Sequence, residues 1–238
     1  MDKYNFWENW ENINSIEEKA IKSIIKAREL IIKSVPKKAL VAIYIKGSFV
    51  RREMNRASDV DIVPIVTENK YEGPVFETNI PEIQPACVVP LSIVELKENK
   101  LLSEKEYNPD LRAEPDLFVL KLEEYKIIYG NQLNPKEYPT RPKEQILDDE
   151  KYKIKNGYIK AYKEGKIELP ALIKEFFWLI ELEQEIKGNK VKHSFVGIAE
   201  SVNNKEHIIY DALEIKNNNY TDKTKENIFI SKLEKYLE

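Results

Sequence analysis

The sequence is poor in cysteine and has no long apolar segment. Its single cysteine, Cys87, means that neither an intramolecular disulfide nor a Cys-x-x-Cys metal site can form. The longest apolar runs, such as "ALVAIYI", are far shorter than the roughly 20 residues that a membrane-spanning helix needs. The first residues, "MDKYNFWENW", lack the basic and then apolar pattern of a signal peptide. These absences predict a soluble, cytoplasmic protein with no membrane partner.

Several common functional motifs are also missing. No G-x-x-x-x-G-K-S/T, G-x-G-x-x-G or G-x-S-x-G is present, which argues against a P-loop, a dinucleotide-binding fingerprint and a nucleophile elbow. The two histidines, His193 and His207, do not form H-E-x-x-H, so a zinc site is not expected. The formal net charge is −3, so there is no global basic field and no strong case for a nucleic-acid partner.

The apolar periodicity of the first half predicts both helices and strands. Residues 15–35 repeat apolar positions every three to four residues, with Ser15 and Glu18 at the spacing of a capping box. Residues 39–46, 59–66 and 85–91 have the composition of β-strands. Pro64 inside the second of these favours either an edge strand or a bulge near its far end.

The pattern changes after a proline-rich, polar stretch that starts near residue 134. From about residue 145 the spacing is helical, and in "LPALIKEFFWLIELEQEIKGN" Pro170 suits a first turn and Gly188 a C-terminal cap. We therefore expect an α/β (α+β) domain over residues 1–135, with a mixed sheet flanked by helices, and a helical domain over residues 145–238.

Asp59 and Asp61 are unusual in an otherwise apolar strand. Residues two apart on a strand point to the same side, with α-carbons roughly 6.5 to 7 Å apart, and two carboxylates there repel each other. A hard cation between the two carboxylates offsets this electrostatic repulsion. Mg²⁺ is such a cation, and it typically binds one or two carboxylates together with substrate phosphates. The alternative is a solvated strand end, which leaves the apolar neighbours "VDIVPIV" unexplained.

The residues before the aspartates fit a phosphate ligand. Gly47 ends the preceding strand and allows the backbone to approach a ligand closely, and Ser48 begins a short helix. Arg51 and Arg52 could bind phosphate oxygens in forked pairs, or else be ordinary surface charges. Ser58 precedes the first aspartate and could orient that turn.

The stretch "GSFVRREMNRASDVD" resembles the signature of the DNA polymerase β-like nucleotidyltransferase superfamily, in which Gly-Ser on a turn precedes Asp-x-Asp on the next strand. Within this superfamily, the stretch most resembles the small bacterial and archaeal members, which include aminoglycoside nucleotidyltransferases and minimal nucleotidyltransferases. The resemblance implies a nucleotidyltransferase core that binds an NTP and two Mg²⁺ ions. It assigns the β- and γ-phosphates to Gly47 and Ser48, and the metals to Asp59 and Asp61. Arg51, Arg52 and Ser58 are expected as further nucleotide-binding residues from their own chemistry and position.

The family also supplies a third carboxylate from a later strand, and here the sequence departs from the pattern. The expected strand, "PACVVPL", contains no acid. Glu82 is the nearest candidate for the third catalytic residue, and Glu77 lies farther away.

The resemblance implies transfer of a nucleoside monophosphate from an NTP, with ATP preferred, to an acceptor hydroxyl, with release of pyrophosphate. The acceptor stays open between a small molecule such as an aminoglycoside, a protein side chain and an RNA end, although the acidic pI of 5.7 disfavours a large nucleic-acid substrate. A homodimer is left open too. The alternative is a non-catalytic NTP-binding or toxin–antitoxin-type module on the same fold, motivated by the missing third carboxylate.

Overall fold

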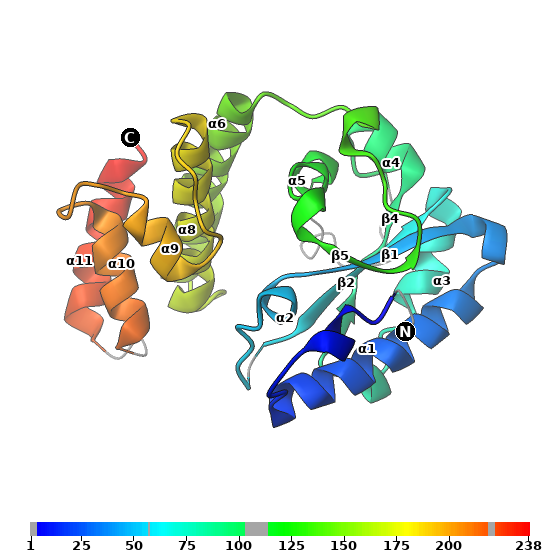
Figure 1. Cartoon of the computed structure of the whole chain (residues 1–238). Coiled ribbons are helices and arrows are strands. Elements are labelled where there is room, and N and C mark those ends of the chain that lie inside the picture. The colour runs from blue at the N-terminus through cyan, green and yellow to red at the C-terminus, as the bar shows by residue number, and fades with distance from the viewer. Residues whose placement is uncertain (1–3, 57, 103–113, 219–221) are drawn as a thin grey trace. The chain divides into compact units, whose positions relative to one another are not determined.

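The computed structural model describes residues 4–56, 58–102, 114–218 and 222–238. The chain divides into two compact units, Met1–Thr140 and Arg141–Glu238 (Figure 1). This division falls inside the stretch that separates the two domains expected from the sequence, residues 1–135 and 145–238. That the units correspond to two functional domains stays a prediction.

The first unit is built on a mixed β-sheet, as the sequence predicted. Its strands are β1 (Leu40–Lys46), β2 (Val60–Val66), β3 (Ala86–Val88), β4 (Leu91–Ser92) and β5 (Lys126–Gly130). The order is β3-β2-β1-β5, and β4 also pairs with β2. β1 is antiparallel to β2 and β5, whereas β2 is parallel to β3 and β4. The antiparallel pairing brings the end of β1 next to the start of β2.

Alternate residues of the strands enter two different cores. Ile43, Ile45 and Ile62 pack with α1 (Ser15–Ser34) on one face. Residues of the opposite parity face the other way, toward α4 (Ile93–Glu98) and α5 (Pro115–Leu120); they are Ala42, Tyr44, Val63 and Ile65. Figure 1 shows the sheet between α1 and α5. The position of a polar residue in this alternation therefore determines on which face of the sheet its side chain lies.

The helix signals in the first unit are mostly confirmed. α4 begins after a capping box, in which Ser92 accepts a hydrogen bond from the Glu95 amide. α1 covers the expected range, but its cap is Asn14, which accepts from the amides of Ile16 and Glu17. The predicted Ser15–Glu18 box is therefore wrong by one residue, since Asn14 is an equally good cap.

Pro64 lies in a central strand, so the edge alternative is wrong. β2 has β1 on one side and β3 and β4 on the other. Pro64 falls between the residues that pair with β3 (60–62) and those that pair with β4 (65 and 66). The missing amide of proline therefore coincides with a break in the neighbouring ladder. The predicted irregularity near the far end is present, because the register with β1 shifts between Leu40 and Ala42.

Short helical segments connect these strands. They are the 3-10 turns η1 (Phe6–Asn9), η2 (Lys37–Ala39), η3 (Asn69–Tyr71), η4 (Pro81–Ile83), η6 (Leu122–Glu124) and η7 (Pro135–Glu137), and the helices α2 (Ser48–Arg51) and α3 (Glu72–Phe76). Of these, α2 and η4 carry residues that the sequence analysis assigned to the site.

The second unit is helical, as expected. Its elements are α6 (Lys143–Lys153), the π-helical turn η8 (Ile154–Tyr158), α7 (Ile159–Lys163), α8 (Leu169–Ile186), α9 (Phe195–Glu200), α10 (Ile208–Asn217) and α11 (Lys223–Tyr236). α8 carries Pro170 in its first turn and is followed by Gly188 at φ +79°, both as predicted. Phe176, Phe177 and Phe229 are fully buried in the core of this unit.

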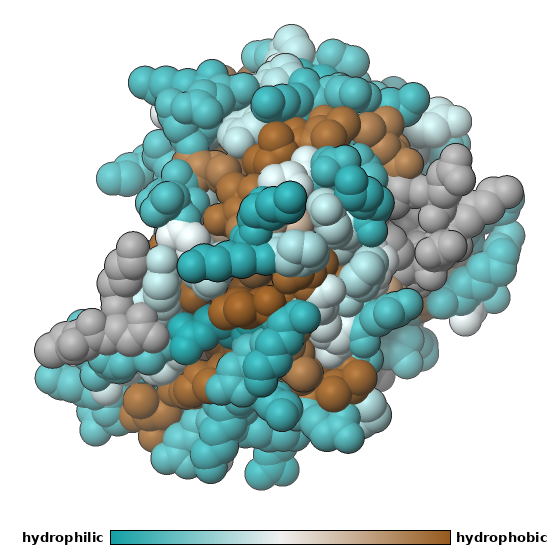
Figure 2. Space-filling model, turned by 90° about the vertical axis from the view of Figure 1, so that its right-hand side faces the viewer, coloured by the Kyte–Doolittle hydropathy of each residue, from teal (hydrophilic) through white to brown (hydrophobic). Residues whose placement is uncertain are grey.

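One face of the molecule carries both hydrophilic and hydrophobic residues. Figure 2 shows hydrophilic residues over much of one face, with hydrophobic residues between them in separate patches. Within the part of the chain that the structure describes, no helix is both long enough and apolar enough to cross a bilayer.

Candidate active site

The end of β1 and the start of β2 bring the Gly-Ser turn next to the second aspartate. Lys46, the last residue of β1, pairs with Asp61 of β2. A Cβ atom at position 47 would lie only 2.6 Å from Oδ2 of Asp61, so the carboxylate occupies the space that glycine leaves open. The adjacency of Gly47 and Asp61, fourteen positions apart in sequence, follows directly from the strand register.

The two aspartates lie at the start of β2 and directly before it. Asp61 is half-buried, and its parity places it on the face of Tyr44 and Val63. Asp59 is exposed and directly precedes β2, which begins at Val60 and not at Asp59 as expected. Asp59 is thus a loop residue beside a strand residue, and together they offer hard oxygen donors of the kind that Mg²⁺ prefers.

Cys87 is the residue of β3 that pairs with Asp61. Its neighbours Ala86 and Val88 enter the core that contains α1, so the thiol lies on the opposite face, which is the face of Asp61. Burial raises the pKa of the Cys87 thiol, the negative charges of Asp59 and Asp61 raise it further, and Lys46 opposes them. Both carboxylates and the ammonium group therefore lie close enough to the thiol to act on it electrostatically.

The expected third carboxylate, Glu82, lies outside the strands. Glu82 is exposed in the turn η4, before β3 begins. Among the described residues, no group of three or more His, Cys, Asp or Glu side chains is arranged to hold a metal ion. The role of Glu82 as the third catalytic residue stays a prediction. The two aspartates suit a magnesium ion whose remaining ligands are phosphate and water oxygens. The residue of β3 beside Asp61, however, is Cys87, which carries a sulfur atom.

The Gly-Ser turn has the geometry expected of it. Gly47 has φ +81° and ψ −154°, a conformation that side chains disfavour, and it caps the single turn α2. Ser48 is half-buried and is the first residue of that turn, and its carbonyl accepts from the amide of Glu53. Phe49 is fully buried and anchors the turn in the core.

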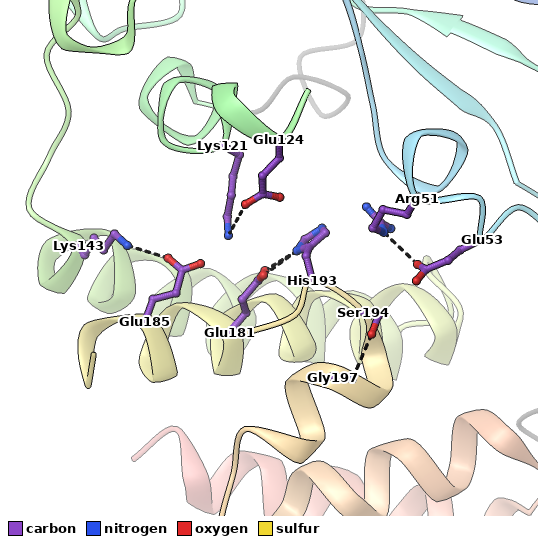
Figure 3. Close-up of polar contacts among 10 residues, drawn as sticks. All are labelled: Arg51, Glu53, Lys121, Glu124, Lys143, Glu181, Glu185, His193, Ser194 and Gly197. Carbon is purple, nitrogen blue, oxygen red and sulfur yellow. Dashed lines mark hydrogen bonds and ion pairs between the residues drawn. The ribbon is translucent and has the colours of Figure 1, made fainter. Parts of the chain in front are cut away.

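The two arginines of the motif have different environments. Arg51 donates from Nε to Glu53 at 2.9 Å on the surface (Figure 3). Arg52 donates to both oxygens of the buried Glu17 at 2.8 and 3.0 Å, and also to the carbonyl of Glu11. Its guanidinium lies over the Trp10 ring, with the central carbon 4.8 Å from the ring centroid. Arg52 is thus engaged within the protein, which argues against its expected role as a phosphate ligand.

Ser58 closes the turn that precedes Asp59. Its hydroxyl accepts a hydrogen bond from the amide of Asn55 at 3.0 Å, and its own amide donates to the Asn55 carbonyl. The expectation that Ser58 orients the turn matches these contacts, whereas nucleotide binding by its side chain stays a prediction.

The second unit contains a distinct group of polar and aromatic side chains. His193 stacks on Trp178 with ring centroids 4.5 Å apart, and its Nδ1 lies 2.7 Å from each carboxylate oxygen of Glu181. Figure 3 shows the Glu181–His193 contact along α8. Trp178 is only partly buried, whereas Glu181 is almost fully buried. A buried acid under an aromatic stack suits a cationic ligand.

Sequence reasoning missed Lys46 and Cys87. Lys46 directly precedes the Gly-Ser turn, so its proximity could have been read from the motif. Cys87 could not, because its position beside Asp61 depends on the register between two strands that are separated by three further segments, η3, α3 and η4.

The comparisons with known proteins identify the fold. Neither a family model nor a curated protein sequence matches the chain. A solved structure does: the spectinomycin adenyltransferase AAD(9) from Enterococcus faecialis, whose structure contains ATP and spectinomycin. The match has a TM-score of 0.57 at 17% sequence identity, and it covers 91% of this chain and 98% of that one.

The chain therefore has a nucleotidyltransferase fold, with a mixed sheet, flanking helices and a C-terminal helical region. More particularly, its fold is similar to that of the spectinomycin adenyltransferase AAD(9) over 91% of its length.

Proposed function

We propose that the chain is a metal-dependent nucleotidyltransferase, which transfers a nucleoside monophosphate from an NTP, with ATP preferred, to an acceptor hydroxyl. The observation that carries this proposal is the convergence of Gly47, Asp59 and Asp61 at one end of the sheet in a nucleotidyltransferase fold. A new bond forms between the acceptor oxygen and the α-phosphorus, the bond to the pyrophosphate oxygen breaks, and the hydroxyl proton passes to a base.

Each residue of the site has a distinct part in this proposal. Asp59 and Asp61 would hold Mg²⁺, which supplies positive charge to the triphosphate when it is bound. Gly47 lets the backbone approach the phosphates, and Ser48 offers a hydroxyl at the same turn. Arg51 stays a candidate for a phosphate contact, because its partner Glu53 lies on the surface, where an ion pair is weak.

The acceptor that we propose is a small cationic molecule with hydroxyl groups, such as an aminoglycoside. The almost fully buried carboxylate of Glu181 and the indole ring of Trp178 support it, because a carboxylate and an indole face both attract a positive charge. The related fold of an adenyltransferase solved with spectinomycin supports the same class.

Nucleotide binding tests the proposal before the acceptor is known. Thermal unfolding is followed with ATP, GTP, CTP and UTP, each with and without Mg²⁺, because a ligand of the native state raises the midpoint. We expect a Mg²⁺-dependent rise that Asp59→Asn and Asp61→Asn abolish while the fold is retained. The matched control is Glu68→Gln, which removes an exposed acid of the same unit. An unchanged rise in both aspartate variants would refute the site.

The second candidate function is a non-catalytic NTP-binding module. The pairing of Asp61 with Cys87, where a third carboxylate would complete the site, favours it. This module would show the same Mg²⁺-dependent binding but release no pyrophosphate from any NTP with any aminoglycoside, and single-turnover assays separate the two candidates.

A further inference from the structure

The position of Cys87 has a consequence for the metal site. In a parallel pair the two strands lie about 4.8 Å apart, and paired residues point to the same side. The Cys87 side chain therefore projects beside the Asp61 side chain, on the same face and at the same level. Among the residues of β3, Cys87 is therefore the one that lies beside Asp61 in register.

Two other residues of the first unit lie next to Asp61. Lys46 pairs with it across β1, and the open space at Gly47 receives its Oδ2. Position 87 is thus the place on the neighbouring strands where an additional negative donor would face Asp61. A short, soft thiol stands there, whereas Mg²⁺ selects hard carboxylate, carbonyl and water oxygens.

We propose that Cys87 limits the affinity of this site for Mg²⁺, and that a carboxylate at position 87 would strengthen Mg²⁺-dependent nucleotide binding. This inference rests on the proposed function, because it assumes that Asp59 and Asp61 bind the metal. In this inference, the residue at position 87 determines the Mg²⁺ concentration that the protein needs in order to bind a nucleotide.

The test is a Mg²⁺ titration of ATP binding, measured by calorimetry, in the full chain. Cys87→Asp and Cys87→Glu are expected to lower the Mg²⁺ concentration at half-saturation by about tenfold or more, the scale on which partners of a metal site act. Cys87→Ser, which removes sulfur without adding charge, is expected to leave it within about twofold. Gln84→Glu is the matched control, because it adds the same charge at an exposed position before β3.

The outcomes separate this inference from the proposed function. If the wild-type protein binds ATP with Mg²⁺ and the folded acidic variants need as much Mg²⁺ or more, the inference fails alone. If Gln84→Glu gives the same gain, the effect is general charge and the inference also fails. If neither the wild-type protein nor the acidic variants bind ATP at any Mg²⁺ concentration, the proposed function fails as well. The lower Mg²⁺ requirement of Cys87→Asp is expected to disappear in the double variant Asp61→Asn/Cys87→Asp, and its persistence there would also overturn the inference.

A second measurement uses the wild-type protein, in case the acidic variants do not fold. Cys87 is the single cysteine of the chain and is half-buried, so iodoacetamide labelling reports on this position alone. ATP with Mg²⁺ is expected to slow labelling about tenfold, and ATP with EDTA is not. Equal labelling rates under saturating ATP and Mg²⁺ would place the thiol away from the metal and overturn the inference.

Discussion

Arg52 binds Glu17 through two hydrogen bonds, from Nε at 2.8 Å and from Nη2 at 3.0 Å, across 35 positions of sequence. This pair joins the first turn of α1 to the residue that ends α2. Glu17 also closes the capping box of α1, because its Oε2 accepts from the amide of Asn14. The segment that carries the Gly-Ser turn is therefore tied to the longest helix of its unit.

The Arg52–Glu17 pair predicts a dependence of stability on pH. The hydrogen bond from Arg52 is the main cause that lowers the pKa of Glu17 below its ordinary value of 4.5. Since the folded pKa is the lower one, the stabilisation is complete above about pH 4.5 and is lost as the pH falls through the folded value.

Glu17→Gln tests this dependence by urea unfolding between pH 3 and 7. We expect a lower midpoint than in the wild-type protein at pH 7 and a smaller loss on acidification. Arg52→Lys should also lower the midpoint at pH 7, because an ammonium group cannot donate the forked pair. Parallel pH curves for the wild-type protein and Glu17→Gln would contradict the assignment.

Gly47→Ala should damage both the fold and the nucleotide site. The backbone conformation at position 47 costs about 1–3 kcal/mol with a side chain, and the new Cβ would displace the Asp61 carboxylate. Gly165→Ala is the control, because Gly165 also has positive φ but nothing lies near its Cβ position. Calorimetry should show lost ATP binding in Gly47→Ala alone. Normal ATP binding in Gly47→Ala would refute the close approach.

Ser92→Ala should destabilise the first unit by about 1 kcal/mol, the usual cost of losing an N-cap. The Ser92 hydroxyl accepts from the Glu95 amide, and both residues are fully buried. Urea unfolding measures the loss. Ser231→Ala, at an exposed helix position, should change stability by less than about 0.5 kcal/mol. Equal effects of the two substitutions would show that the cap contributes nothing.

Glu181→Gln should separate acceptor binding from nucleotide binding. The substitution removes the charge next to His193, so binding of a cationic aminoglycoside should weaken by about tenfold or more, as for the loss of a charged hydrogen bond. ATP binding in the presence of Mg²⁺ should not change. Glu185→Gln, one turn along the same helix, is the control, because Glu185 pairs with Lys143. Equal acceptor binding in Glu181→Gln and the wild-type protein would exclude this acceptor site.

The elements that the sequence predicted well are those with a local cause. Apolar spacing located α1 and α8, and the residues flanking α8 located its ends. The motif from Gly47 to Asp61 is also local, since a turn and two adjacent strands suffice to bring its ends together.

The features that the sequence did not predict depend on partners far away in the chain. Arg52 looked like a phosphate ligand, but Glu17 and the Glu11 carbonyl bind it. Glu82 was the acid nearest to the third strand, but Cys87 is the residue paired with Asp61. Alternation along a strand predicts which residues share a face, whereas the register between strands follows only from the complete fold.

The described hydrophobic cores do not share a residue between the units. The core around Phe176 and Phe229 contains only residues after position 141, and the two cores of the sheet contain only residues before it. In evolutionary terms, substitutions that reshape the helical unit leave the packing beneath Gly47 and Asp61 untouched. Under the function proposed above, the unit assigned to the acceptor can therefore change while the core beneath the nucleotide site keeps its residues.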